Sequence, residues 1–178
     1  MTAAVWKMPS TIQPETLALA QELKISLLTA QLLTNRGVNT PVAARAFLKP
    51  DGSNLIAPEI IPGLEMARDR LAMAVRAGEK ILIFGDYDAD GLTATAIMLE
   101  TLERLGIKAG YYLPERFAEG YGISIDALRN IQEKGYTLVV TVDCGITAVE
   151  EAVWAQEQGL ELIITDHHQP GEDLPSVT

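Results

Sequence analysis

Carboxylate and imidazole side chains gather in three short segments of this 178-residue sequence. The first and second contribute only carboxylates, and the third contains both histidines of the chain. Together they hold Asp86, Asp88 and Asp90, then Asp143, and last Asp166, His167 and His168. Such groups brought into one cleft would suffer desolvation and like-charge repulsion unless cations lay among them. We therefore expect a divalent-metal site, provided that the fold brings the three segments to one place.

The mixture of ligand types narrows the choice of metal. Carboxylate oxygens suit Mg²⁺ and Mn²⁺, and the two imidazoles favour Mn²⁺, because Mg²⁺ prefers oxygen and water. Zinc fits this set of ligands less well. Two ions about 4 Å apart, bridged by a carboxylate, would bind a phosphodiester and lower the pKa of a bound water. The predicted chemistry is metal-dependent phosphoester hydrolysis.

Four apolar runs of strand length position these segments, and three of them end at the acidic residues. Helical stretches beginning near Leu92, Ser124 and Thr147 separate the runs, and Thr147 with Glu150 has the spacing of a capping box. The runs are KILIFGD, KAGYYLP, TLVVTVD and LELIITD. This alternation predicts an α/β fold in which flanking helices cover a parallel sheet. Because ligands bind outside the carboxyl ends of such strands, we expect the acidic segments at one edge of the sheet.

The N-terminal third of the sequence has a different pattern and is typical of short helices. Pro14 suits a first helical residue, Gly37 suits a helix stop, and Thr40 suits an N-cap. A proline-containing stretch follows, before the next helical pattern begins. We therefore predict a small helical N-terminal module over 1–62 and an α/β domain over 63–178.

The charge of the chain is uneven along the sequence. The formal net charge is −10 and the pI is about 4.6. Residues 1–80 carry nine basic and seven acidic side chains, net +2, whereas residues 81–178 carry five and seventeen, net −12. A protein that coats DNA through its net electrostatic field is therefore excluded.

The cysteine content and the hydropathy of the sequence indicate a subcellular localisation. Cys144 is the single cysteine, which excludes an internal disulfide and fits a reducing compartment. The first ten residues lack the pattern of a secretory signal, and no apolar run approaches the roughly 18 residues that span a bilayer. We expect a cytoplasmic protein with no membrane partner.

The first acidic segment fits neither of two other motifs, the EF-hand calcium loop and the P-loop. The string DYDADG matches the first six positions of an EF-hand loop, but the twelfth position is Ile97, where that loop needs a bidentate Glu. The string also lacks the lysine of a P-loop. A lone aspartate at a strand end is more often a cap or turn residue than a ligand, and adjacent histidines can form a solvated loop. Three acidic strand ends together favour the metal site.

The three segments resemble the motifs of the DHH phosphoesterase superfamily, which is named for the triplet at 166–168. The motifs stand here as GDYDADG at 85–91, VDCG at 142–145 and TDHH at 165–168. Within the superfamily the chain is similar to the RecJ family of single-stranded-DNA-specific 5′ to 3′ exonucleases. Three further stretches carry that likeness, LLTNRG at 32–37, AFLKP at 46–50 and PERFAEGYG at 114–122. The resemblance implies a role in DNA repair and recombination on single-stranded DNA, with a single-strand binding protein or a helicase as further partners.

The resemblance also implies roles for individual residues. Asp88, Asp90, Asp143 and His167 match metal ligands, with Asp143 as a bridge between two ions of Mn²⁺ or Mg²⁺. His168 matches a catalytic residue that touches the metal shell or the scissile phosphate.

Three other positions have less definite roles in the resemblance. Asp166 would act in catalysis by orienting the histidines. Many relatives have a histidine at the position of Phe84, so Asp86 is a possible additional ligand or an outer carboxylate. Arg116 is either a phosphate contact or a surface arginine paired with a neighbouring glutamate.

The family's fourth motif, which supplies another metal-binding aspartate, is not found before Thr178. We therefore expect an N-terminal portion of a longer enzyme, truncated before that motif and weakly active or inactive by itself. Two alternatives stay open. One is a DHH hydrolase of short oligonucleotides, cyclic dinucleotides or pyrophosphate, and the other is a DHH scaffold without catalysis.

Overall fold

The computed structural model describes residues 12–52, 55–115 and 122–177. The chain divides into two compact units, Met1–Pro58 and Glu59–Thr178, and each is described by itself. The predicted domain boundary at residue 62 and the predicted truncation before a fourth motif both stay predictions. Within the described residues, no helix is long and apolar enough to cross a membrane.

The first unit contains three short helices, α1 (Pro14–Leu23), α2 (Leu27–Asn35) and α3 (Pro41–Leu48). Proline occupies the first turn of α1 and α3, where its missing N–H costs no helical hydrogen bond. The hydroxyls of Ser26 and Thr40 cap α2 and α3 by accepting backbone N–H bonds. Small and aliphatic side chains from all three helices form the core, namely Leu19, Ala30, Leu33 and Ala44.

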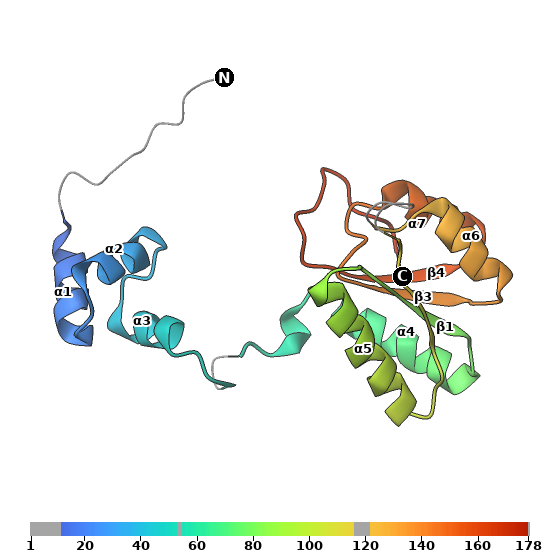
Figure 1. Cartoon of the computed structure of the whole chain (residues 1–178), viewed down its shortest axis with the longest axis horizontal. Helices are drawn as coiled ribbons and strands as arrows, with labels where there is room; N and C mark the ends of the chain where they lie inside the picture. Colours follow the sequence, from blue (N-terminus) through green and yellow to red (C-terminus); the bar gives the residue numbers. More distant parts are fainter. Residues whose placement is uncertain (1–11, 53–54, 116–121, 178) are drawn as a thin grey trace, which may run out of the picture. The chain divides into compact units, whose positions relative to one another are not determined.

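The second unit is built on a four-stranded sheet in the order β2-β1-β3-β4, with every neighbouring pair parallel. Figure 1 labels β1, β3 and β4 of this sheet. The strands are β1 (Ile81–Gly85), β2 (Gly110–Tyr112), β3 (Leu138–Val142) and β4 (Glu161–Thr165). The register pairs Gly85 with Val142 and Val142 with Thr165. The carboxyl ends of β1, β3 and β4 are therefore level, and the acidic segments that follow them start side by side.

Helices cover both faces of this sheet. In Figure 1, α4 (Leu64–Ala77) and α5 (Ala89–Arg104) lie on one face, and α6 (Ile125–Glu133) and α7 (Val149–Glu157) lie on the other. Alternate side chains of the buried strands β1 and β3 enter two separate apolar clusters, one under each helix pair. The predicted parallel α/β fold with flanking helices is confirmed.

The starts of two helices differ from the sequence prediction. Helix α5 begins at Ala89, ahead of Leu92, because the Asp88 carboxylate caps it. Helix α7 begins at Val149 with Ala148 as its N-cap and no side-chain cap bond, so the capping box at Thr147 was wrong. A turn closed by the bond from Ala148 N to Gly145 O places Thr147 ahead of the helix. The predicted start at Ser124 is confirmed, since its hydroxyl caps α6.

Candidate metal centre

The segment after β1 turns at once into the N-terminus of α5. The Asp86 side chain is buried, and one of its oxygens accepts a bond of 2.7 Å from Tyr87 N. Asp88 Oδ1 accepts hydrogen bonds from Asp90 N at 2.9 Å and from Gly91 N at 3.1 Å. Both bonds lower the pKa of the Asp88 carboxyl, and the bond from Gly91 has the larger effect. A Cβ at Gly91 would lie 2.5 Å from Asp86 N, so only glycine allows this tight turn.

The segment after β3 contains a left-handed residue, Asp143, with φ +63°. Its backbone N–H donates to Thr165 O on β4 at 3.0 Å. The Thr141 hydroxyl donates to Cys144 O at 2.8 Å, and the Thr165 hydroxyl donates to Thr141 O at 2.7 Å. Burial, above all, raises the pKa of the Asp143 carboxyl, and the nearby Asp88 charge adds to the increase.

The segment after β4 is organised by the Asp166 carboxylate, whose side chain is 1% exposed. Its Oδ1 accepts from the backbone N–H groups of His167 and His168 at 2.7 and 3.0 Å, and its Oδ2 accepts from Ile146 N at 2.9 Å. Burial by itself would raise the pKa of Asp166, but these bonds together lower it. The ring nitrogen Nδ1 of His168 lies 2.7 Å from the same Oδ1, and this hydrogen bond raises the pKa of His168.

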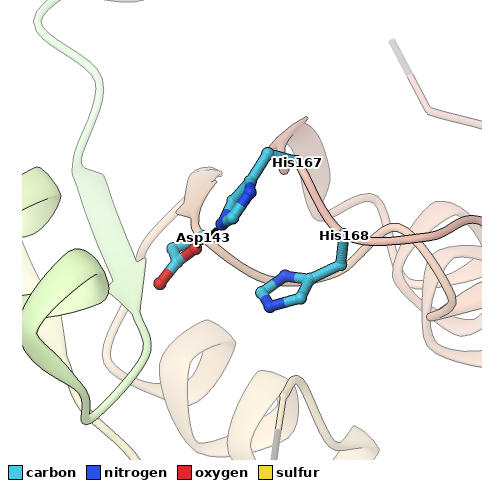
Figure 2. A group of neighbouring side chains, drawn as sticks. All are labelled: Asp143, His167 and His168. Atoms are coloured by element: carbon cyan, nitrogen blue, oxygen red, sulfur yellow. Dashed lines mark ion pairs between the residues drawn. The ribbon is translucent and has the colours of Figure 1, made fainter. Parts of the chain in front are cut away.

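Asp143 stands between two groups of side chains that could each hold a metal ion. One group is Asp143 with His167 and His168, and the other is Asp143 with Asp86 and Asp88. In each group the ligand atoms lie within 4.8 Å of one another. His167 Nε2 lies 2.9 Å from Asp143 Oδ1, and Figure 2 shows both imidazoles on the loop after β4, directed to the side where Asp143 lies. The tertiary structure therefore brings together the three strand ends named from the sequence.

A cavity of about 570 Å³ opens beside these groups. Asp90, Asp143, Asp166 and His167 line its polar side. Apolar side chains of α5 and β3 line the rest, namely Ala94, Ile97, Met98 and Val142. Asp90 thus faces the same cavity, although it joins neither group of three.

The donor set fits a hard divalent cation. Asp86 and Asp143 are only 3% and 8% exposed, and Asp88 lies within reach of both. Buried carboxylates packed this closely are stabilised by a cation with oxygen-rich coordination, such as Mn²⁺ or Mg²⁺. Cys144 does not belong to this set, because burial raises the pKa of its thiol to about 12 and keeps it protonated.

Arg116 and the loop residues beside it lie outside the described residues, so its predicted phosphate contact stays a prediction. Sequence reasoning missed the residues that shape the site without being ligands. These are Thr141, Thr165 and the backbone N–H of Ile146, which contact neighbouring strand ends. The bonds of Thr165 and of Ile146 N join segments that only the fold brings together, whereas the bond from Thr141 to Cys144 O is local and depends on the turn that the chain makes after β3.

With this geometry in place, comparison with known proteins decides the family. The model of the DHH family, N-terminal domain, matches residues 80–178, more than half of the chain. The chain belongs to the DHH family. The predicted superfamily is thereby confirmed.

Relatives of this DHH chain include three single-stranded-DNA-specific exonucleases named RecJ. The protein of Bacillus subtilis is 45% identical over 172 residues, which cover 97% of this chain and 22% of that protein. The protein of Escherichia coli is 35% identical over 150 residues, covering 84% of this chain and 25% of the relative. That of Thermus thermophilus is 44% identical over 115 residues, covering 65% and 17%. The DHH chain therefore spans about a quarter or less of these relatives.

Solved structures support the same assignment of fold. A crystal structure of exonuclease RecJ bound to manganese matches with a TM-score of 0.64 and 41% identity, over 69% of this chain and 32% of that one. RecJ from Thermus thermophilus in complex with Mn²⁺ matches with a TM-score of 0.66 and 32% identity, over 90% of this chain and 22% of the other. The α/β architecture of the DHH domain is therefore shared with proteins that bind Mn²⁺.

Proposed function

We propose that this chain is the N-terminal part of a RecJ-like exonuclease that hydrolyses the phosphodiester bonds of single-stranded DNA from the 5′ end in a metal-dependent reaction. One observation carries the proposal: Asp143 is shared by two groups of three potential ligands at level strand ends. The likeness to RecJ exonucleases over most of the chain supports the choice of substrate.

In this proposal two ions of Mn²⁺ or Mg²⁺ bind at the strand ends. Asp88, Asp90, Asp143 and His167 would hold them, and Asp143 is the residue common to both groups of potential ligands. Asp86 lies within 4.8 Å of its partners in the acidic group and would be an additional ligand or an outer carboxylate. The chemistry that bound ions supply is Lewis-acid activation of water and of the phosphodiester.

The protein's own groups have a separate task beside the ions. Asp166 accepts a hydrogen bond from His168 Nδ1 and so fixes the orientation of the ring. The raised pKa of His168 favours a proton on its second nitrogen, Nε2. We assign the Nε2–H group of His168 as a hydrogen-bond donor to a phosphate oxygen of the substrate. Asp166 is the residue that positions the His168 ring.

The biological setting is also part of the proposal. We assign the protein to DNA repair and recombination, in the cytoplasm, and infer a single-strand binding protein or a helicase as further partners. Support for this setting is the name of the relatives and the single free cysteine. The acidity of the chain is compatible with a DNA substrate, because Asp86, Asp88 and Asp143 form a group that could hold a cation and Asp90 lines the cavity beside it.

The test uses the natural full-length protein with a 5′-labelled single strand, a matched duplex and a dinucleotide, in Mn²⁺ or Mg²⁺. We expect digestion of the single strand from its 5′ end, and a loss of at least about a hundredfold in D90A, which removes a charged group from the cavity. Full activity of D90A would contradict the ligand assignment.

Two other outcomes separate the alternatives. Faster turnover of the dinucleotide than of the long strand would favour a DHH hydrolase of short substrates. An absence of specific Mn²⁺ binding in calorimetry would favour a scaffold without catalysis. The 178-residue chain should bind Mn²⁺ but turn over DNA weakly or not at all, and robust processive digestion by this chain would refute that expectation.

A further inference from the structure

A buried hydroxyl lies directly beneath the residue shared by the two candidate ligand groups. Thr141 is fully buried on β3, two positions before Asp143. Its hydroxyl reaches past Asp143 and donates a hydrogen bond of 2.8 Å to Cys144 O. A buried polar group of this kind contributes directed geometry that an apolar side chain of equal size does not.

The bond from Thr141 spans a residue in an unusual backbone conformation. Among the described residues, Asp143 and Lys24 are the non-glycine residues with positive φ, and Lys24 lies at the end of α1, where this conformation is common. Asp143 lies instead at the end of a central strand. A left-handed residue at such a place persists only where the surrounding bonds determine it.

Three hydrogen bonds surround this left-handed turn. Asp143 N donates to Thr165 O, the Thr165 hydroxyl donates to Thr141 O, and the Thr141 hydroxyl closes the turn at Cys144 O. The first two attach the turn to β4. The third, from Thr141, is the bond to Cys144 O that lies within the turn itself; two further side-chain bonds hold the same segment from outside, from Cys144 Sγ to Phe84 O at 3.9 Å and from Ile146 N to Asp166 Oδ2 at 2.9 Å.

Packing constrains the same turn from its other end. Gly145 has φ +108°, and a Cβ there would lie 3.2 Å from the Thr141 hydroxyl oxygen and 3.1 Å from Ile123 Cδ1. The Thr141 hydroxyl therefore bonds Cys144 and lies beside the space that a side chain at position 145 would occupy, so both constraints act just after Asp143. Because the side chain is fully buried and its hydroxyl is bonded to Cys144 O, the hydroxyl is held in the donating position.

We propose that Thr141 is a positioning residue of the candidate metal centre: its hydroxyl holds the turn after β3 so that the Asp143 carboxylate reaches both ligand groups. The relevance to metal rests on the proposed function. The role of Thr141 in the backbone conformation of Asp143 does not rest on the proposed function, and that conformation can be measured without a bound ion.

The test compares three variants of the 178-residue chain. T141V keeps the volume but removes the hydroxyl, and T141S keeps the hydroxyl. T137V is the matched control, because the Thr137 hydroxyl donates to Glu79 Oε2 at the opposite end of β3. We measure the backbone coupling and carbon shifts of Asp143 by NMR in the metal-free protein, and the Mn²⁺ dissociation constant by calorimetry.

T141V is expected to lose the left-handed signature of Asp143 and to bind Mn²⁺ about 10- to 100-fold more weakly, the usual effect of removing a group that orients a ligand. T141S should retain both properties to within about threefold in affinity, and T137V should bind Mn²⁺ like the wild type.

An unchanged conformation and affinity in T141V would overturn the proposal. If T141V does not fold, T141A takes its place, and failure of both while T141S folds would show that the hydroxyl supports the whole sheet, which also overturns it. If the wild type binds no Mn²⁺, the proposed function fails, whereas the NMR signature of Asp143 still decides the role of Thr141.

Discussion

Nε2 of His167 lies 2.9 Å from Oδ1 of Asp143, across the ends of the neighbouring strands β3 and β4. The two side chains belong to different motifs of the sequence, and the parallel register makes them neighbours. In the metal-free protein this contact offsets part of the cost of burying the Asp143 carboxylate, which nevertheless keeps a raised pKa. The site therefore holds an ionisable group at a cost in stability, as sites built for a ligand often do.

The variant D143N should separate that cost from metal binding. Asparagine fits the left-handed backbone and removes the buried charge, so we expect the melting temperature of the metal-free chain to rise by about 2–4 °C, equivalent to about 1 kcal/mol at this size. The increase in melting temperature that Mn²⁺ gives to the wild type should disappear, because the carboxylate common to both groups of potential ligands is lost. Thermal unfolding with and without Mn²⁺ measures both effects, and a metal-free D143N less stable than the wild type would count against this account.

Asp88 is expected to show two separable roles, because it caps α5 and belongs to the acidic ligand group. D88N keeps an N-cap acceptor but loses the charge, whereas D88A loses both. Both variants should bind Mn²⁺ at least about tenfold more weakly, and only D88A should lose about 1 kcal/mol of stability. Calorimetry and chemical unfolding check the pair, and equal stabilities for D88N and D88A would show that the cap contributes nothing.

The bond between Asp166 and His168 predicts a change in titration. D166N should lower the pKa of His168 in the metal-free protein, because the hydrogen bond to the charged carboxylate is the main cause of its raised value. NMR titration of the His168 ring measures this shift. D126N, which changes an exposed aspartate paired with Arg129, is the matched control and should leave His168 unaffected.

The same pair sets the sign of a pH effect on stability. Asp166 has a lowered folded-state pKa, so its contribution is present above the ordinary value of 3.8 and is lost as pH falls through the lowered value. His168 has a raised folded-state pKa, so its contribution is present below 6.5 and is lost as pH rises through the raised value. The free energies of unfolding of the wild type and D166N should differ most between pH 3.8 and pH 6.5, where both contributions are present. The same difference at every pH would contradict a role of the Asp166–His168 pair in stability.

Metal affinity should fall as the solution is acidified. Ligation requires neutral imidazole and ionised carboxylate, and the raised pKa of Asp143 extends proton competition above the range of an ordinary aspartate. We expect the Mn²⁺ dissociation constant to increase from about pH 8 to about pH 5.5, where histidines titrate. Calorimetry in two buffers with different ionisation enthalpies would detect proton release on binding. Affinity that did not vary with pH would contradict the binding of the ion by imidazole and carboxylate groups.

An ion-pair network far from the site offers a test of specificity. Arg70 on α4 bonds Glu79 at 2.9 Å and Glu161 at 2.7 Å, at the end of the sheet opposite the acidic segments, and its side chain is largely buried. R70M should lose about 1–3 kcal/mol of stability, because two carboxylates lose a charged donor. Its Mn²⁺ affinity, measured on the folded protein, should equal that of the wild type. A weakened metal site in R70M would mean that ligand affinity simply follows global stability.

Much of this architecture could be predicted because its signals are local. The apolar runs and the intervening helical patterns gave the strands β1 to β4 and the order of the elements, and parallel pairing placed the acidic segments at one edge. Helix starts were harder to predict. Asp88 was named as a ligand, and its additional role as the cap of α5 became visible only in the structure.

By itself, the sequence determined which residues carry the chemistry, because carboxylates and imidazoles in short motifs are visible without coordinates. Only the tertiary structure decided how they divide the work. The strand register places Asp143 in both ligand groups, and the buried Asp86 belongs to one of them. Asp166 is occupied by backbone N–H groups, and the Thr141 hydroxyl closes the turn around Asp143. The strand register, the bond from Ile146 N to Asp166 and the burial of Asp86 and Asp143 depend on segments distant in the chain, and such interactions exist only once the sheet has formed. The local bonds of Thr141 and His168 become part of the site only because the sheet places their segments side by side.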